Sequence, residues 1–299
     1  MEKTERTTEW QGLLAKCTLC PAECGANRLT GVGACGVQGL KIAKYYLHPF
    51  EEPCLSFDKG SGTVFFCGCN LRCPFCQNYE VSRAKRGKEL TPRQLADVFR
   101  EVEEMGADNL SLVTPSHFVP YLVAAFCIYR PKIPVVYNCG GYEKVSTLRL
   151  IDPYIDVYLP DLKFYSASLS KRYLGKEDYF ERASEAVRFM AQKPLKMTAE
   201  GKMLSGTIVR HLVMPLCVSD SKRVLKWIKE ELPPTVFVSL MSQYTPFGEI
   251  EKFPELSRGI TSREYDGVLQ EAFALGLENR LFAQDRSSSG RQFIPEWDF

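Results

Sequence analysis

Three cysteines stand close enough in the sequence to hold one metal centre. Cys69, Cys73 and Cys76 follow the pattern Cys-x3-Cys-x2-Cys, and Phe75 directly precedes the last of them. A [4Fe-4S] cluster normally takes four thiolates, so three leave one iron open to a ligand that is not protein. An open metal position is where a substrate or cofactor enters. The pattern predicts an iron–sulfur cluster used in chemistry, against the alternatives of a zinc knuckle or buried thiols that pack as small apolar side chains.

A second group of cysteines lies near the N-terminus. Cys17, Cys20, Cys24 and Cys35 are separated by glycines and a proline, which allow the tight turns that bring four sulfurs around one centre. Four thiolates make a closed, structural type of site. Zinc and a second iron–sulfur cluster both suit four thiolates, and the sequence does not separate them. The alternative is a loop-rich cap of reduced, packed cysteines.

Strands alternate with helices after this cysteine-rich part. The predicted strands are 62–67, 109–113, 134–138, 155–160, 206–214 and 235–240. The predicted helices are 92–105, 120–129, 143–151, 177–192, 220–232 and 261–275. Thr91 with Gln94, and Thr261 with Glu264, fit the capping-box pattern at the starts of the first and last of these helices. Such alternation is typical of βα units with a parallel sheet. We predict an α/β fold: a partial (β/α)6 TIM-type barrel at 61–299 with a C-terminal extension, preceded by a small Cys-rich N-terminal extension at 1–60.

Composition narrows the class of protein. The 299 residues contain 38 Lys and Arg against 36 Asp and Glu, which gives no bulk attraction to nucleic acid or to an anionic membrane. The first 16 residues lack a basic stretch followed by an apolar run, so we expect no signal peptide. No segment approaches the roughly 20 apolar residues of a transmembrane helix. We expect a cytoplasmic protein, in which twelve cysteines point to metal binding rather than to disulfides. Cys127, on an apolar helical pattern, is predicted to be buried in the core.

The run at 62–78, Gly-Thr-Val-Phe-Phe-Cys-Gly-Cys-Asn-Leu-Arg-Cys-Pro-Phe-Cys-Gln-Asn, resembles the opening of radical S-adenosylmethionine (SAM) enzymes, a strand followed by the cysteine loop. The resemblance implies that the amino and carboxylate groups of SAM chelate the open iron. It also implies that an electron from the cluster splits SAM into methionine and a 5′-deoxyadenosyl radical, which removes a hydrogen from a substrate. Phe75 would then lie against the adenine of SAM. Asn78, two residues after Cys76, is a further candidate for binding SAM.

Other strand ends resemble those of the pyruvate formate-lyase activating enzymes. Functional groups of a βα barrel gather at the C-terminal ends of its strands. After the third predicted strand, Asn138 stands where that family has an aspartate that contacts SAM. After the fourth, Asp161-Leu-Lys163 reproduces the family's Asp-Leu-Lys motif, in which the lysine pairs with the SAM carboxylate. The fifth predicted strand carries Val209-Arg210-His211, similar to the family's Val-Arg-Tyr, so Arg210 is a candidate to face the same cavity. After the sixth strand, Thr245 stands where the family has a histidine that contacts SAM, and Gln243 is the candidate to serve in its place. The alternative for each is a polar residue that caps a helix or meets water.

One segment departs from the family pattern. A Gly-Gly-Glu-type motif usually follows the second strand, but here the chain reads Thr114-Pro-Ser116-His117 and lacks the carboxylate. Thr114, Ser116 and His117 are candidate replacements near SAM, with a structural histidine as the alternative for His117. This variant, the N-terminal cysteines and the ending Phe-Ala-Gln-Asp…Phe-Ile-Pro-Glu-Trp resemble the PflX-like branch of activating-enzyme homologues.

The resemblance implies a flavodoxin or ferredoxin as electron donor. It suggests hydrogen abstraction from a glycine of a partner glycyl-radical enzyme, with radical modification of a peptide or small molecule as the alternative. A non-catalytic iron–sulfur or zinc-binding protein is the hypothesis from another class. Such electron carriers usually saturate each cluster with protein ligands, so three cysteines favour an enzyme.

Overall fold

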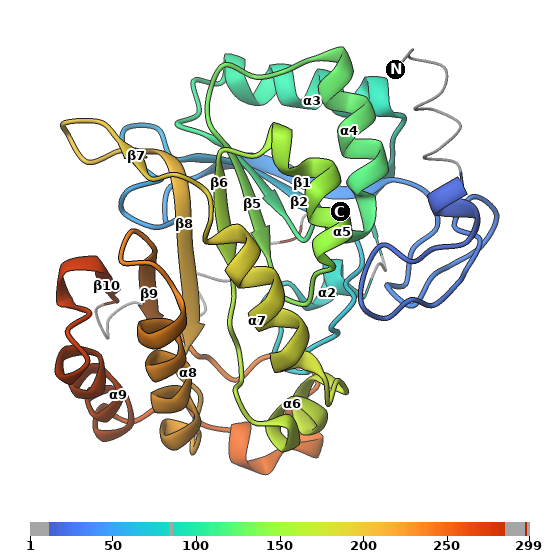
Figure 1. Ribbon diagram of the computed structural model, residues 1–299. Coiled ribbons are helices and arrows are strands. Elements are labelled where there is room, and N and C mark those ends of the chain that lie inside the picture. Colours follow the sequence, from blue (N-terminus) through green and yellow to red (C-terminus); the bar gives the residue numbers. More distant parts are fainter. Residues whose placement is uncertain (1–11, 84–85, 285–296, 298–299) are drawn as a thin grey trace. The chain divides into compact units, whose positions relative to one another are not determined.

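The structure is a computed structural model that describes residues 12–83, 86–284 and 297 (Figure 1). Part of the segment on which the signal-peptide prediction rests, and most of the C-terminal motif of the family resemblance, lie outside the described residues. The described chain divides into two compact units, residues 12–72, 80–156 and 297 in the first, and residues 73–79 and 157–284 in the second. Both units have the α/β organisation that the sequence predicts, with mostly parallel strands.

The first unit contains three of the predicted strands as parallel neighbours. Its strands are β1 (Lys41–His48), β2 (Ser61–Phe66), β3 (Lys88–Glu89), β4 (Leu110–Val113) and β5 (Val135–Cys139). β4 pairs in parallel with both β2 and β5, and every residue of these three strands is buried. Burial on both faces explains their nearly continuous apolar sequences. β1 was not predicted; it pairs antiparallel with β2 and β3 and is only half-buried.

The helices of the first unit are α3 (Pro92–Glu104), α4 (Val119–Ile128) and α5 (Val145–Ile151), and α2 (Tyr79–Ser82) begins at the last residue of the second unit's segment. The predicted capping box at Thr91 and Gln94 is confirmed, because each side chain accepts from the backbone of the other. Figure 1 shows α3 alongside α4, with which it packs.

The prediction that Cys127 is buried in the core is wrong. It lies on α4 as expected, but it is exposed and its Sγ is 3.4 Å from the Tyr154 hydroxyl. Ile128, the last residue of the same helix, is 46% exposed. The apolar pattern therefore continues beyond the residues that reach the core.

The second unit contains the other three predicted strands. Its elements are β6 (Val157–Pro160), α6 (Ala167–Leu174), α7 (Tyr179–Met190), β7 (Lys196–Met197), β8 (Met203–Leu212), α8 (Val218–Glu231), β9 (Phe237–Met241), α9 (Ser262–Ala274) and β10 (Leu281–Ala283). β8 pairs in parallel with β6 and β9, and β10 continues the parallel order beside β9. α9 begins at the predicted capping box of Thr261 and Glu264, and packs on α8 (Figure 1).

The cysteine-rich N-terminal segment is part of the first unit. Leu14, Cys17 and Leu19 form a small buried cluster, and Tyr121 of α4 packs against it. Arg28 is fully buried and holds backbone carbonyls. None of the described helices is both long and apolar enough to pass through a lipid bilayer.

Candidate functional site

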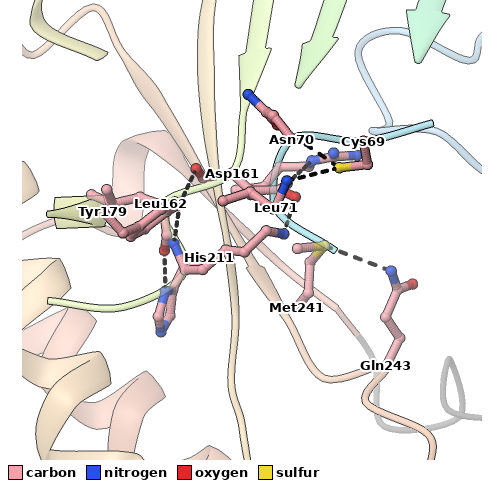
Figure 2. Close-up of polar contacts among 11 residues, drawn as sticks. Cys69, Asn70, Leu71, Asp161, Leu162, Tyr179, His211, Met241 and Gln243 are labelled. Atoms are coloured by element: carbon pink, nitrogen blue, oxygen red, sulfur yellow. Dashed lines mark hydrogen bonds and ion pairs between the residues drawn. The ribbon is translucent and has the colours of Figure 1, made fainter. Parts of the chain in front are cut away.

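The cysteine loop begins in the first unit, directly after β2. The backbone N–H of Cys69 donates to the carbonyl of Cys35 over 3.0 Å. Gly68 has a φ of +79°, and a Cβ at this position would lie 2.5 Å from the same carbonyl. Glycine is therefore required for this close approach. Figure 2 shows Cys69 with Leu71, whose N–H donates to the Cys69 sulfur over 3.4 Å. Such N–H donors stabilise a thiolate.

The rest of the loop belongs to the second unit, where it packs on the chain after β9. The carbonyl of Pro74 accepts from the Glu249 N–H over 2.8 Å. Gly248 has a φ of +83°, and a Cβ there would lie 2.3 Å from the Pro74 carbonyl oxygen. The Gln77 side-chain amide donates to the carbonyl of Gln243 over 3.4 Å. Figure 2 also shows the Gln243 amide near the Met241 sulfur, at 3.7 Å. These contacts fix the segment that carries Cys73 and Cys76.

An aromatic cluster surrounds Phe75. Its ring meets those of Phe164, Tyr173 and Tyr244 edge to face, with centroids 6.2–6.4 Å apart. Phe75 is itself buried. Edge-to-face packing of this kind holds an aromatic ring in a defined orientation.

A charged triad lies at the C-terminal ends of β6 and β8. One carboxylate oxygen of Asp161 accepts from Arg210 Nε over 2.8 Å, and the other accepts from Lys163 Nζ over 2.6 Å. Burial opposes ionisation of Asp161, but Arg210 and Lys163 outweigh it and hold the pKa of this carboxyl below its ordinary value. Burial also opposes the charge on Lys163, yet Asp161 and then Cys73 raise the pKa of the ammonium group. Two cations thus share one carboxylate, in the same unit as Cys73.

Backbone contacts hold this triad in place. The Tyr179 hydroxyl donates to the carbonyl of Asp161 over 3.0 Å and accepts from the N–H of Lys163 over 2.9 Å. His211 Nδ1 is 2.7 Å from the carbonyl of Leu162 (Figure 2). Both side chains are buried, so the Asp-Leu-Lys segment is anchored on both sides of Leu162.

The Thr114–His117 segment follows β4 in the first unit. Thr114 has a φ of +61°, a strained conformation for a β-branched residue, and its N–H donates to the carbonyl of Asn138 over 2.8 Å. His117 is 1% exposed, and its Nε2 lies 2.8 Å from the carbonyl of Cys67. Burial, then the nearby Arg28, lower the pKa of His117 to about 3, so its ring is neutral at physiological pH. Strained backbone gathers at functional sites, which agrees with a role for Thr114.

Glu143 was missed by the sequence analysis. It lies just after β5, is 3% exposed, and accepts hydrogen bonds from the hydroxyls of Ser116 and Tyr137, the latter over 3.1 Å. Burial raises the pKa of this carboxyl to about 7, although the hydrogen bonds from Ser116, Tyr137 and Cys139 oppose the rise. A carboxyl at a strand end, five residues after Asn138, was the available signal.

A hydrogen bond links the cysteine loop to the chain that leads into Glu143. The Asn70 side-chain amide donates to the carbonyl of Tyr142 over 2.8 Å. The loop start, the Thr114–His117 segment and the chain after β5 are therefore joined within the first unit.

The N-terminal cysteines share one loop system. Burial raises the pKa of Cys20 to about 12, and Glu143, Cys17 and Cys35 add to the rise, so these groups lie within electrostatic range of one another. Cys24 differs: burial alone would raise its pKa, but the N–H groups of Ala34 and Ala26 and the charge of Arg28 lower it. Across residues 12–83, 86–284 and 297, no three His, Cys, Asp or Glu side chains already converge as metal ligands would.

The predicted residues thus fall into two sets. The first unit holds Cys69, Thr114, Ser116, His117 and Asn138 together with Cys17, Cys20, Cys24 and Cys35. The second holds Cys73, Phe75, Cys76, Asn78, Asp161, Lys163, Arg210 and Gln243. Within the second set, Asp161, Lys163 and Arg210 are in direct contact, and Lys163 is in electrostatic range of Cys73.

Residues 63–204 match the family model described as the radical SAM superfamily. This match covers the Cys69–Cys76 loop, Asp161 and Lys163. An uncharacterized protein of Methanocaldococcus jannaschii is 27% identical over 278 residues, which are 90% of this chain and 77% of that protein.

Solved structures show more distant likeness. SuiB of Streptococcus suis, in a structure bound to its precursor peptide SuiA, is 12% identical with a TM-score of 0.49 over 73% of this chain and 46% of SuiB. The chain therefore spans less than half the length of SuiB. A domain of pyruvate-formate lyase-activating enzyme from Bacteroides vulgatus is 12% identical with a TM-score of 0.37, over 65% of this chain and 91% of that domain.

Proposed function

We propose that this protein is a radical SAM enzyme that reductively cleaves SAM and abstracts a hydrogen from a substrate. The observation that carries the proposal is the partly buried triad of Asp161, Lys163 and Arg210, with Lys163 in electrostatic range of Cys73. Lysine and arginine are the side chains that bind a ligand carboxylate most strongly, and the triad places one of each beside the other. The family match over residues 63–204 supports the same chemistry.

Cys69, Cys73 and Cys76 are the proposed ligands of a [4Fe-4S] cluster. The argument is their spacing, which leaves one iron open, together with the N–H donor of Leu71 at the Cys69 sulfur. When bound, the cluster supplies the electron that splits the sulfonium of SAM into methionine and a 5′-deoxyadenosyl radical.

In the proposed complex, the triad orients SAM by binding the carboxylate group of SAM. Lys163 and Arg210 are both held by Asp161, so their side chains are fixed before SAM arrives, and less ordering entropy is lost on binding. Lys163 acts as a point charge, whereas Arg210 presents a planar guanidinium group. Phe75 is the proposed contact for the adenine, because its ring is already oriented by three aromatic neighbours.

The remaining predicted residues are proposed to supply polar contacts to SAM. They are Asn78, Thr114, Ser116, Asn138 and Gln243. His117 is proposed to act as a neutral group, because it is buried and its pKa is about 3. A neutral imidazole forms no ion pair with SAM and does not act as a general acid.

The substrate is proposed from sequence resemblance. The motifs shared with activating enzymes favour a glycine of a partner protein as the hydrogen source, with a peptide or small molecule as the alternative. The PflX-like branch and the flavodoxin or ferredoxin donor rest on the same resemblance. The cytoplasmic location is proposed from the cysteine usage, which suits metal binding in a reducing compartment.

A metal at Cys17, Cys20, Cys24 and Cys35 is also proposed. The donor set fits zinc or an iron–sulfur centre, and the N–H groups directed at Cys24 favour its thiolate.

Substrate classes are distinguished by following the abstracted hydrogen. The reconstituted enzyme would be incubated with SAM, reductant and a candidate polypeptide made with deuterium at glycine Cα. Deuterium in 5′-deoxyadenosine supports a glycine target. Cleavage of SAM without deuterium transfer from that polypeptide refutes it as the substrate. Absence of 5′-deoxyadenosine under all conditions refutes radical SAM activity itself.

A further inference from the structure

Gln284, which belongs to the Phe-Ala-Gln-Asp run of the sequence, has both ends of its side-chain amide engaged. It directly follows β10 in the second unit. Its Oε1 accepts from the backbone N–H of Ser242 over 3.1 Å, and its Nε2 lies 3.3 Å from Oε1 of Gln243. The side chain therefore bridges the two residues that follow β9.

The backbone of Gln284 is held against the same strand end. Its N–H donates to the carbonyl of Leu240 over 3.1 Å. The hydroxyl of Tyr265, a buried residue of α9, lies 3.0 Å from the carbonyl oxygen of Leu240 and 3.1 Å from that of Gln284. Because its main chain is fixed on both sides, the Gln284 side chain starts from a defined point.

The backbone amide of Ser242 decides how both glutamine side chains are turned. A backbone N–H can only donate, so the atom of Gln284 that faces it is the carbonyl oxygen. The other end of the Gln284 amide is then the NH2 group, which also can only donate, so Gln243 must turn its own oxygen toward it. The orientation of two amides thus follows from one backbone donor. The Nε2 of Gln243 is left to face the other way.

That Nε2 lies on the face of the sheet that carries the charged triad. It is 3.7 Å from the sulfur of Met241, which is a weak acceptor (Figure 2). In the paired strands β8 and β9, Arg210 lies opposite Ser239, and Leu212 lies opposite Met241. Alternate residues of a strand point to the same face, so the side chains of Arg210 and Met241 project from one face. The Gln243 donor is therefore on the side from which Arg210 reaches its carboxylate partner.

We infer that Gln284 is a positioning residue, which orients the Gln243 amide so that its N–H donors face SAM. The inference rests on the proposed function, in which Gln243 supplies a polar contact to SAM, and it assigns the direction of that contact. A donor amide binds an acceptor of SAM, such as a carboxylate, ribose or adenine atom, and not the ammonium group, which only donates. The main chain of Gln243 is held separately by Gln77, so Gln284 controls the side chain.

Three substitutions separate orientation from shape and charge. Gln284→Glu keeps the shape and the acceptor for Ser242, but it presents a second acceptor to Gln243. The Gln243 amide must then turn over and face SAM with its oxygen. Gln284→Met removes both hydrogen bonds and leaves the Gln243 amide free to turn. Gln270→Glu adds the same charge at an exposed glutamine of α9 and is the control.

SAM is the probe, and the full-length protein with its reconstituted cluster is used. In equilibrium binding, Gln284→Glu should weaken SAM affinity about tenfold or more, the worth of one good hydrogen bond, and Gln284→Met about threefold. Gln270→Glu should match the parent. In 5′-deoxyadenosine formation, the KM for SAM should rise by the same factors, with turnover at saturating SAM within about twofold of the parent. A merely structural defect would instead lower turnover and the thermal midpoint.

A double-mutant cycle tests whether Gln284 acts through Gln243. Gln243→Met leaves no amide to be turned, so adding Gln284→Glu to it should change SAM affinity by about twofold or less. The same comparison isolates any direct effect of the added negative charge on SAM. The expected result is strong coupling between the two positions, with the whole loss present once either side chain is replaced.

Equal losses of SAM affinity from Gln284→Glu with and without Gln243→Met would overturn the inference, since Gln284 would then act independently. So would SAM affinity equal to that of the parent in Gln284→Glu. A Gln243→Met protein that binds SAM as the parent does would refute the inference and leave the proposed function intact, because the triad and the cluster do not depend on it. A parent protein that binds no SAM and forms no 5′-deoxyadenosine would refute the proposed function and this inference together.

Discussion

Replacement of Glu143 by glutamine should change how the stability of the protein depends on pH. Glu143 is buried with its carboxyl between Ser116 and Tyr137, and its pKa is raised from 4.5 to about 7. Between these values the folded protein binds more protons than the unfolded chain. The resulting stabilisation is fully present below pH 4.5 and is lost as pH rises through about 7. A glutamine does not titrate, so the variant lacks this dependence.

The magnitude follows from the size of the shift. At about 1.4 kcal/mol per pKa unit, the wild type should lose about 3 kcal/mol relative to Glu143→Gln between pH 4.5 and pH 8. The assay is urea unfolding of both metal-free chains under reducing conditions at several pH values. Taking the difference between the chains cancels the titration of groups that both share.

Two further variants test the cause of the raised pKa of Glu143. Ser116→Ala and Tyr137→Phe each remove a hydrogen bond that opposes the rise in the pKa, so each should steepen the pH dependence. Parallel stability curves for the wild type and Glu143→Gln would refute the argument, because they would show that Glu143 has an ordinary pKa when buried.

Three other predictions concern the proposed cluster and the charged triad. Lys163→Ala should weaken SAM binding about tenfold or more in equilibrium binding while iron content is kept, and unchanged affinity would remove Lys163 from the site. Asp161→Asn removes the carboxylate that two partly buried cations share, so we expect a loss of about 2 kcal/mol or more in unfolding free energy, whereas a loss below about 1 kcal/mol would mean that water replaces the carboxylate at Lys163 and Arg210. Cys73→Ala should abolish the cluster and SAM cleavage, but Cys20→Ala should lower stability and keep the cluster absorbance; SAM cleavage by Cys73→Ala would disprove the ligand assignment.

Six of the parallel strands were predictable because their sequences are short apolar runs bounded by glycine, proline and polar residues, whereas the short β10 was not predicted. Burial on both faces imposes such runs, as in β4 and β5. β1 lacked this signal, since a half-buried antiparallel strand mixes polar and apolar residues. Helix starts at Thr91 and Thr261 were predictable from capping boxes, which are local.

The site was predicted only in part, because pairing between distant residues is not local. The sequence indicated Asp161, Lys163 and Arg210 separately by their positions at strand ends, but not that Asp161 binds both cations. Glu143 lies after β5, whereas the resemblance placed the carboxylate of related enzymes after the second predicted strand, so the family pattern did not indicate Glu143. The environment of Arg28 depends on the path of several loops, which no periodicity reports.

Anaerobic reconstitution of the protein is the decisive experiment for radical SAM catalysis, with iron, sulfide and zinc counted per chain and 5′-deoxyadenosine measured with dithionite as reductant. We expect about four irons and four sulfides for one [4Fe-4S] cluster, together with dithionite-dependent 5′-deoxyadenosine. One zinc would identify the N-terminal metal, and additional iron would indicate a second cluster there. A protein that takes up no iron and forms no 5′-deoxyadenosine would refute the proposed catalysis and leave a metal-binding protein.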